Sequence, residues 1–209
     1  MDQKTTGGFS GMLRATLDFI RQMLLAPAAQ LRDMEKSGGF TEPVLLIVRL
    51  GLLAGVVRIF VTFYHMANGA SVGLLRALSA VLFVPVSLLA ISYIAAFLLW
   101  LVMRLLGRDS DLETAFRVVA HLCALAPVAV LALAIPYLGN LLLFAALAYL
   151  LVIAAIEVYQ LGSNTAWAVF GVGCALLALF AVAAEYRARQ PQSCCPVAVE
   201  LVQEAAPRS

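Results

Sequence analysis

Four ionisable side chains lie within strongly apolar stretches of this chain, where they could do chemistry: Arg49, Arg58, His121 and Glu157. A charge at the centre of a membrane costs about 2.5 to 3.5 kcal/mol on insertion scales, so each such group needs a partner or a role. Glu157 with His121 or Arg49 could form a proton- or ligand-responsive intramembrane site, because burial and a nearby cation shift the protonation of a carboxyl in opposite directions. The alternative is that Glu157 only balances charge near the membrane interface.

Other residues that carry chemistry do not form a catalytic pattern. The chain has two histidines, His65 and His121, and it lacks the H-E-x-x-H motif of metalloproteases. The four cysteines are two single residues in apolar stretches and an adjacent pair near the C-terminus: Cys123, Cys174, Cys194 and Cys195. The single cysteines indicate packing, whereas the pair could form intermolecular disulfides or carry a lipid. We therefore expect no enzyme activity, no metal site and no cofactor.

The apolar stretches are too long and too uncharged for a water-soluble protein. Hydrophobic residues make up 63% of the chain and charged residues 12%, against about a quarter charged in soluble domains. Between Arg117 and Glu185 the only formal charge is Glu157. At about 20 residues per helix, this run is long enough for three membrane spans, and two further apolar stretches precede it.

The sequence predicts an all-α, polytopic membrane protein with five transmembrane helices preceded by an amphipathic N-terminal region. The expected spans are 43–64, 78–103, 114–135, 140–161 and 165–184, forming a membrane domain 43–184 between a cytoplasmic segment 1–42 and a flexible tail 185–209. Ser110 and Glu113 have the spacing of a capping box, which indicates that span 3 begins near Asp111. A turn at Gly139 and Asn140 separates spans 3 and 4.

Helical rotation within span 1 separates its two arginines. Arg58 shares a face with Gly51 and Gly55, whose G-x-x-x-G spacing allows another helix to approach closely, so we expect Arg58 to face protein. Arg49 points the opposite way, and its side chain can extend to the lipid headgroups.

The region before span 1 has the pattern of an amphipathic helix. Charged Arg14, Asp18 and Arg21 occupy one side, while apolar residues occupy the other: Met12, Leu13, Leu17, Ile20 and Leu24. Pro27 interrupts this helix, and a second short helix runs to Gly38-Gly39. The pair either lies on the membrane surface or packs against the helix bundle.

Basic residues indicate the orientation. Residues 1–42 contain five of them, whereas Arg76 alone follows span 1, so the positive-inside rule places the N-terminus in the cytoplasm. Arg104, Arg108 and Arg117 in the next loop agree. Five spans then place the tail outside, although Arg187 and Arg189 at its start oppose this. The composition, rich in alanine and leucine and poor in lysine, favours a bacterial inner membrane.

Three stretches of the chain carry a family resemblance. They are 26–46 (APAAQLRDMEKSGGFTEPVLL), 116–139 (FRVVAHLCALAPVAVLALAIPYLG) and 155–170 (AIEVYQLGSNTAWAVF). In their Gly-Gly, Pro and Pro-Tyr-Leu-Gly positions they resemble the Yip1 family of five-span membrane proteins, particularly its bacterial branch. Eukaryotic members bind Rab-type GTPases through their cytoplasmic N-terminus. Here that segment is short and has GFTEP at 39–43 in place of a Leu-Tyr-Gly-Pro-like sequence, so GTPase binding is not expected.

Two functions follow as expectations. The first is a non-enzymatic scaffold that organises the membrane or recruits a protein partner through residues 10–35, in contact with lipids and with itself as a homo-oligomer. The net charge of +2 gives no reason to expect nucleic acid binding. The second is a small transporter or channel, in which Arg58 faces protein and Pro85 and Pro127 break their helices at mid-depth.

Overall fold

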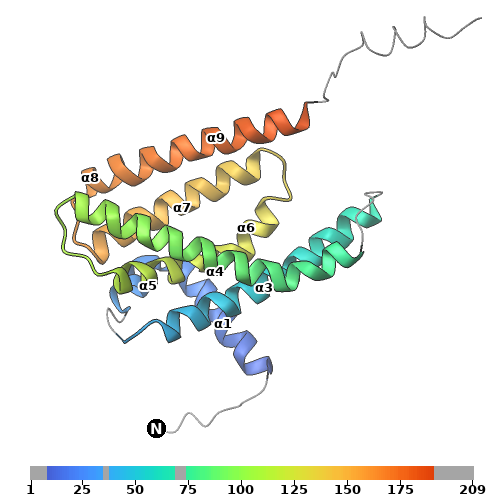
Figure 1. The fold of residues 1–209 in the computed structure, drawn as a ribbon, viewed down its shortest axis with the longest axis horizontal. Coiled ribbons are helices and arrows are strands. Elements are labelled where there is room, and N and C mark those ends of the chain that lie inside the picture. The colour runs from blue at the N-terminus through green and yellow to red at the C-terminus, as the bar shows by residue number, and fades with distance from the viewer. Residues whose placement is uncertain (1–8, 35–37, 69–73, 191–209) are drawn as a thin grey trace, which may run out of the picture.

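The computed structural model describes residues 9–34, 38–68 and 74–190, and every regular element within them is helical (Figure 1). Five helices are long and apolar enough to cross a membrane, which confirms the predicted number of spans. Their bounds are Thr41–Ala67, Leu78–Leu105, Leu112–Ala132, Leu138–Glu157 and Ser163–Arg189. The adjacent cysteines Cys194 and Cys195, which could form intermolecular disulfides or carry a lipid, lie outside the described residues.

The first two spans form an antiparallel hairpin, and the third packs against it. Helices α3 (Thr41–Ala67) and α4 (Leu74–Leu105) lie side by side, as do α7 (Leu138–Glu157) and α9 (Val172–Arg189) (Figure 1). The third span consists of α5 (Leu112–Leu122), a 3₁₀ turn (Cys123–Leu125) and α6 (Ala126–Ala132). It contacts α3 and also α7, so it joins the two helix pairs. The fifth span begins with α8 (Ser163–Ala166) and a π-helical turn (Trp167–Gly171).

Burial differs strongly between the spans. The most apolar window of the third span is 61% buried, whereas the corresponding windows of the second and fifth spans are only 17% buried. Large apolar side chains such as Leu82 and Phe180 remain exposed on these outer helices. Such surfaces are suited to lipid and not to water. The third span is therefore the centre of the bundle.

Helix α3 packs closely on α4 at Pro85. A Cβ atom on Gly51 would lie 2.7 Å from Cα of Pro85, so only glycine permits this contact. Helix α4 runs through Pro85 without interruption, and the prediction that this proline breaks its helix is wrong. The third span does break, at the 3₁₀ turn that precedes Pro127. A neighbouring helix supports Pro85, because Gly51 and Gly55 are both buried against α4.

The region before span 1 packs against the bundle on one side. Helix α1 (Phe9–Leu25) buries Ile20 and Met23, and α2 (Pro27–Arg32) buries Leu31 and contacts α7. Pro27 occupies the first turn of α2, where its missing N–H is harmless. The second helix ends earlier than predicted, at Arg32, and residues 35–37 lie outside the described part of the chain.

Candidate functional site

Glu157, the central residue of the predicted intramembrane site, pairs with a residue that the sequence analysis did not consider. Its Oε2 atom accepts hydrogen bonds from Nη2 of Arg32 at 2.8 Å and from Nε at 3.0 Å. Arg32 comes from α2, so the pair ties this helix to the end of α7. Among the described contacts Glu157 therefore pairs with Arg32, and not with His121 or Arg49 as in the site hypothesis, because the docking of α2 brings a cation to the end of α7.

This pairing leads to a prediction about stability. Replacing Glu157 with Gln is expected to lower the free energy of unfolding in detergent by less than about 1 kcal/mol, because the Arg32 side chain is 69% exposed and solvent screens the pair. Arg32→Gln and the double variant complete a double-mutant cycle that isolates the pair. A loss above about 2 kcal/mol would show that Glu157 does more than pair with Arg32.

His121 has a packing role. Its Nδ1 atom lies 2.9 Å from the carbonyl oxygen of Arg117, and because a carbonyl only accepts, Nδ1 carries the hydrogen. The imidazole meets the ring of Phe19 edge-on, with 5.4 Å between the ring centroids. This contact attaches α1 to the third span. His121 thus bonds within α5 on one side and contacts α1 on the other.

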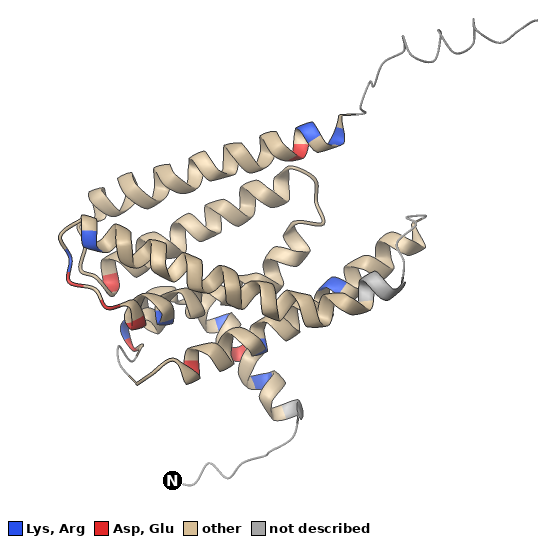
Figure 2. Cartoon of the chain, viewed as in Figure 1, with Lys and Arg blue, Asp and Glu red and all other residues tan. Residues whose placement is uncertain are grey.

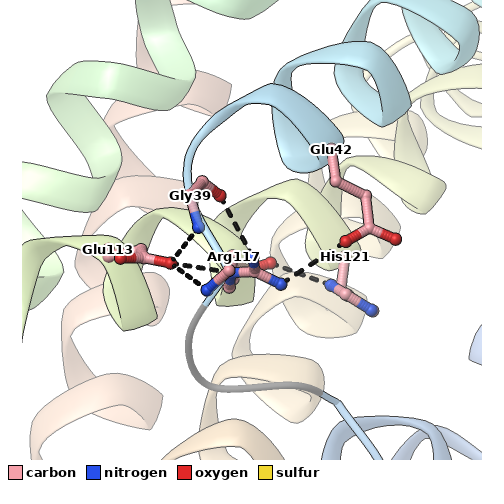
Figure 3. Close-up of polar contacts among 6 residues, drawn as sticks. Gly39, Glu42, Glu113, Arg117 and His121 are labelled. Atoms are coloured by element: carbon pink, nitrogen blue, oxygen red, sulfur yellow. Dashed lines mark hydrogen bonds and ion pairs between the residues drawn. The ribbon is translucent and has the colours of Figure 1, made fainter.

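The main polar cluster surrounds Arg117, whose side chain is only 5% exposed (Figure 3). Its Nη2 atom donates to the carbonyl oxygen of Gly39 at 3.1 Å, and its Nε atom lies 3.4 Å from Oε1 of Glu113. Its Nη1 atom lies 3.7 Å from the Glu42 carboxylate. We call these residues, together with Gly38, the Arg117 cluster. A buried arginine requires this many partners, because an unpaired charge in the interior is strongly unfavourable.

Glu113 completes the cluster by binding the Gly38-Gly39 turn. Its Oε1 atom accepts from the backbone N–H groups of Gly38 at 2.8 Å and of Gly39 at 2.7 Å. Both glycines have positive φ angles, 144° and 86°, which favour glycine. The prediction that span 3 begins near Asp111 is confirmed, because Asp111 is the N-cap of α5. The predicted capping box is wrong, because no side chain caps the helix and Glu113 binds a segment far away in the sequence.

The sequence carries a signal for this cluster in the spacing of three polar residues. Glu113, Arg117 and His121 follow one another at intervals of four residues, so they line one face of α5. Glu113 was interpreted as a cap and Arg117 only as a topology charge. A polar stripe on an otherwise apolar span indicates a polar neighbour, and that neighbour is the segment before span 1.

The remaining candidates, Arg49 and Arg58, are both exposed. The predicted protein contact of Arg58 is not found among the described residues of this chain, where the side chain is exposed. The end of the α3–α4 hairpin projects beyond α6 (Figure 1). The two arginines are nine residues apart on α3, which corresponds to about 14 Å along the helix axis. The hydrocarbon core of a bilayer is about 30 Å thick. If they are centred in it, each Cα lies about 8 Å from a boundary, and each side chain can extend to its nearer headgroups.

A second polar cluster connects the end of α9 to the turn that precedes α7. The Glu185 carboxylate accepts from the backbone N–H of Tyr137 at 3.1 Å and from Nδ2 of Asn140 at 2.8 Å, and it pairs with Arg189 at 2.7 Å. Tyr137 has a φ angle of 58°, so the carboxylate satisfies a donor in an unusual turn. Figure 2 shows acidic and basic residues near the ends of the long helices. These charged contacts connect helices to turns.

The hydroxyl group of Tyr159, two residues after Glu157 in the sequence, is buried. Neither its oxygen nor that of Ser110 has a hydrogen-bond partner among the described residues. Burial raises the pKa of Tyr159 to about 12, and the neighbouring Ser110 hydroxyl opposes the shift. The phenol is therefore neutral at physiological pH and does not serve as a general base there.

The described residues offer little that is typical of a catalytic centre. They contain no group of three or more metal-binding side chains. Residues 69–73 read G-A-S-V-G, which has the letters of the hydrolase G-x-S-x-G motif. That motif requires a turn from a strand into a helix. Here the flanking elements are the helices α3 and α4, so the context does not match.

The comparisons with known proteins give one match. A family model described as the Yip1 domain matches residues 21–184, which is most of the chain and includes all five spans almost completely. No curated protein and no solved structure matches the sequence. The matched region begins within α1 and contains both members of the Arg32–Glu157 pair and the whole Arg117 cluster.

Proposed function

Because this chain belongs to the Yip1 family of membrane proteins, we propose that it is a non-enzymatic scaffold that holds α1 at one side of the membrane to organise the bilayer or to recruit a protein partner. The proposal includes a cytoplasmic N-terminus, a bacterial inner membrane and a homo-oligomeric state. The five basic residues before span 1 support this orientation.

One observation supports the scaffold role above all. Polar residues of the third and fourth spans are occupied in holding the region before span 1. Glu157 holds α2, the Arg117 cluster holds the Gly38-Gly39 turn, and His121 contacts Phe19 of α1. A membrane protein that binds a polar solute would be expected to direct such groups towards a cavity. Here they fix the position of a helix that has an exposed polar side.

The exposed polar side of α1 is the surface proposed for a protein partner. It consists of Ala15, Asp18 and Gln22, which lie on adjacent turns and are all exposed. Residues 10–35 cannot simply be deleted to test this, because Met23 and Leu31 are buried in the core. Substitutions on the exposed side leave the packed side intact.

A double substitution tests partner recruitment. Native mass spectrometry of the protein released from its own membrane should show a stoichiometric protein partner, and Ala15→Arg with Asp18→Arg should reduce its occupancy at least tenfold. The reason is that bulk and charge at a packed interface disrupt it without changing the core. Asn164→Arg, an exposed position in the turn before the fifth span, is the control and should leave occupancy unchanged.

The transporter alternative rests on a different observation, the 3₁₀ break at Cys123–Leu125 in the third span. Irregular backbone at membrane depth occurs where it lines a cavity or is buried in protein. Cys123 and Leu125 are buried here, and Cys123 Sγ lies 3.3 Å from Oγ of Ser92. A solute flux across proteoliposomes that Arg58→Ala abolishes would favour transport over the scaffold.

A further inference from the structure

The rotation of α1 about its own axis is fixed by its contacts. Thr16, Ile20 and Met23 are buried against the bundle. Phe19 meets His121 of the third span, and α1 also packs on the Cys123–Leu125 turn. Every other direction around this helix is therefore defined relative to the bundle.

An apolar edge of α1 remains uncovered beside the buried side. Leu17 is 49% exposed and Leu24 is 41% exposed. They are seven residues apart, so they project within about 20° of each other. Neither residue lies on the side that packs against the bundle. In water this edge would be an unfavourable apolar surface.

Two arginines follow this edge around the helix. Arg14 and Arg21 are exposed and are also seven residues apart, about 60° further round than the two leucines. Asp18 and Gln22 lie beyond them. The order around α1 is thus protein, apolar edge, arginines and polar side. An interfacial helix has this order, with arginines at the level of the lipid phosphates.

The contacts of α1 also give its level along the spans. Its ring contact, His121, lies about 14 Å along α5 from Leu112, and exposed Arg49 lies about 12 Å along α3 from Thr41. The starts of these two helices meet in the Arg117 cluster, so both residues are at a similar level. Arg49 is exposed at this level, and its side chain can extend towards the headgroups on that side.

We propose that the edge of α1 formed by Leu17 and Leu24 rests in the headgroup boundary of an anionic phospholipid bilayer, with Arg14 and Arg21 contacting lipid phosphates. The occupant is lipid because the edge is apolar, its flank is basic and α1 is held beside a membrane span. This inference concerns a different side of α1 from the one proposed for a protein partner, so either can fail without the other.

Lipid contact can be measured residue by residue. The full-length protein, with Cys194 and Cys195 replaced by Ala and one introduced cysteine carrying a fluorophore, is placed in nanodiscs that contain phosphatidylglycerol. Phosphatidylcholine with a doxyl group near its headgroup should quench labels at Leu17→Cys and Leu24→Cys at least threefold more than labels at Asp18→Cys and Gln22→Cys. Cys123 and Cys174 are buried and should stay unlabelled.

Three outcomes would overturn the proposal. Equal quenching by lipid at all four positions would show that the edge contacts lipid no more than the polar side does. Stronger quenching by aqueous iodide at Leu17 and Leu24 would place the edge in water. Shielding of these two labels from both quenchers would show that protein covers the edge.

A second measurement tests the arginines. Arg14→Gln with Arg21→Gln should reduce the phosphatidylglycerol retained per protein in native mass spectra at least twofold, relative to phosphatidylcholine, because the phosphate contacts lose their charge. The control is Arg187→Gln, an exposed arginine near the end of α9. Unchanged lipid retention in the double variant would contradict the anionic preference.

Discussion

Arg117→Met is expected to lower the free energy of unfolding by about 3 kcal/mol and to release the region before span 1 from the bundle. Removing one partner of a buried ion pair costs about 3 to 5 kcal/mol. The lower end applies here because the Glu42 side chain is 78% exposed and can be solvated without its partner. Glu113 is only 28% exposed, and the Gly39 carbonyl loses its donor as well.

Denaturant unfolding in detergent measures the loss, and hydrogen exchange of the α1 and α2 amides reports the release. Arg187→Met is the matched control, since Arg187 is exposed, and it should change stability by less than about 0.5 kcal/mol. Arg117→Lys keeps the charge but not the planar fork of donors, so it should restore only part of the loss. An Arg117→Met protein as stable as the wild type would mean that the cluster does not hold this region.

Gly51→Ala is expected to destabilise the α3–α4 hairpin by about 2 kcal/mol. The added Cβ would lie 2.7 Å from Cα and 3.1 Å from Cβ of Pro85, so the two helices must move apart. Overpacking of this kind costs about 1 to 3 kcal/mol. The neighbouring Gly55→Ala should cost less, because its nearest contact would be 3.1 Å, to Cα of Val81.

Gly173→Ala provides the control for this prediction. A Cβ at Gly173 meets no atom within 4 Å, so the substitution should be neutral or slightly stabilising, since alanine favours helix by up to about 1 kcal/mol over glycine. The same unfolding measurement applies to all three variants. If Gly51→Ala matched Gly173→Ala, the close approach at Pro85 would not contribute to stability.

Several charged residues in the described part of the chain join elements that are distant in the sequence. Arg32 and Glu157 are 125 residues apart, and Gly38 and Glu113 are 75 residues apart. Each of these contacts closes a long loop of chain, so its energetic benefit depends on the bundle already being formed. In this arrangement, intramembrane polarity serves to position α1 and α2. The proposed scaffold role follows from that use of charge.

Particular residues show how far sequence reasoning extended. The apolar runs gave the number of spans, and Pro27 marked the boundary between α1 and α2. Glu113 was misread because the Ser110–Glu113 spacing is a local pattern, whereas its actual partners lie on another segment. For Arg58, helical rotation gives a direction but not the place where a neighbouring helix ends.

By itself the sequence determined the class of the protein, its five spans and its amphipathic first helix, because these depend on the length, period and charge of continuous segments. Only the tertiary structure decided which polar groups meet. In the structure Glu157 pairs with Arg32 and not with His121, and Glu113 binds the Gly38-Gly39 turn. Arg58 is exposed. The physical reason is that a hydrogen bond or an ion pair acts over a few ångströms in space, and separation along the chain carries no information about which distant segments fold to within that distance.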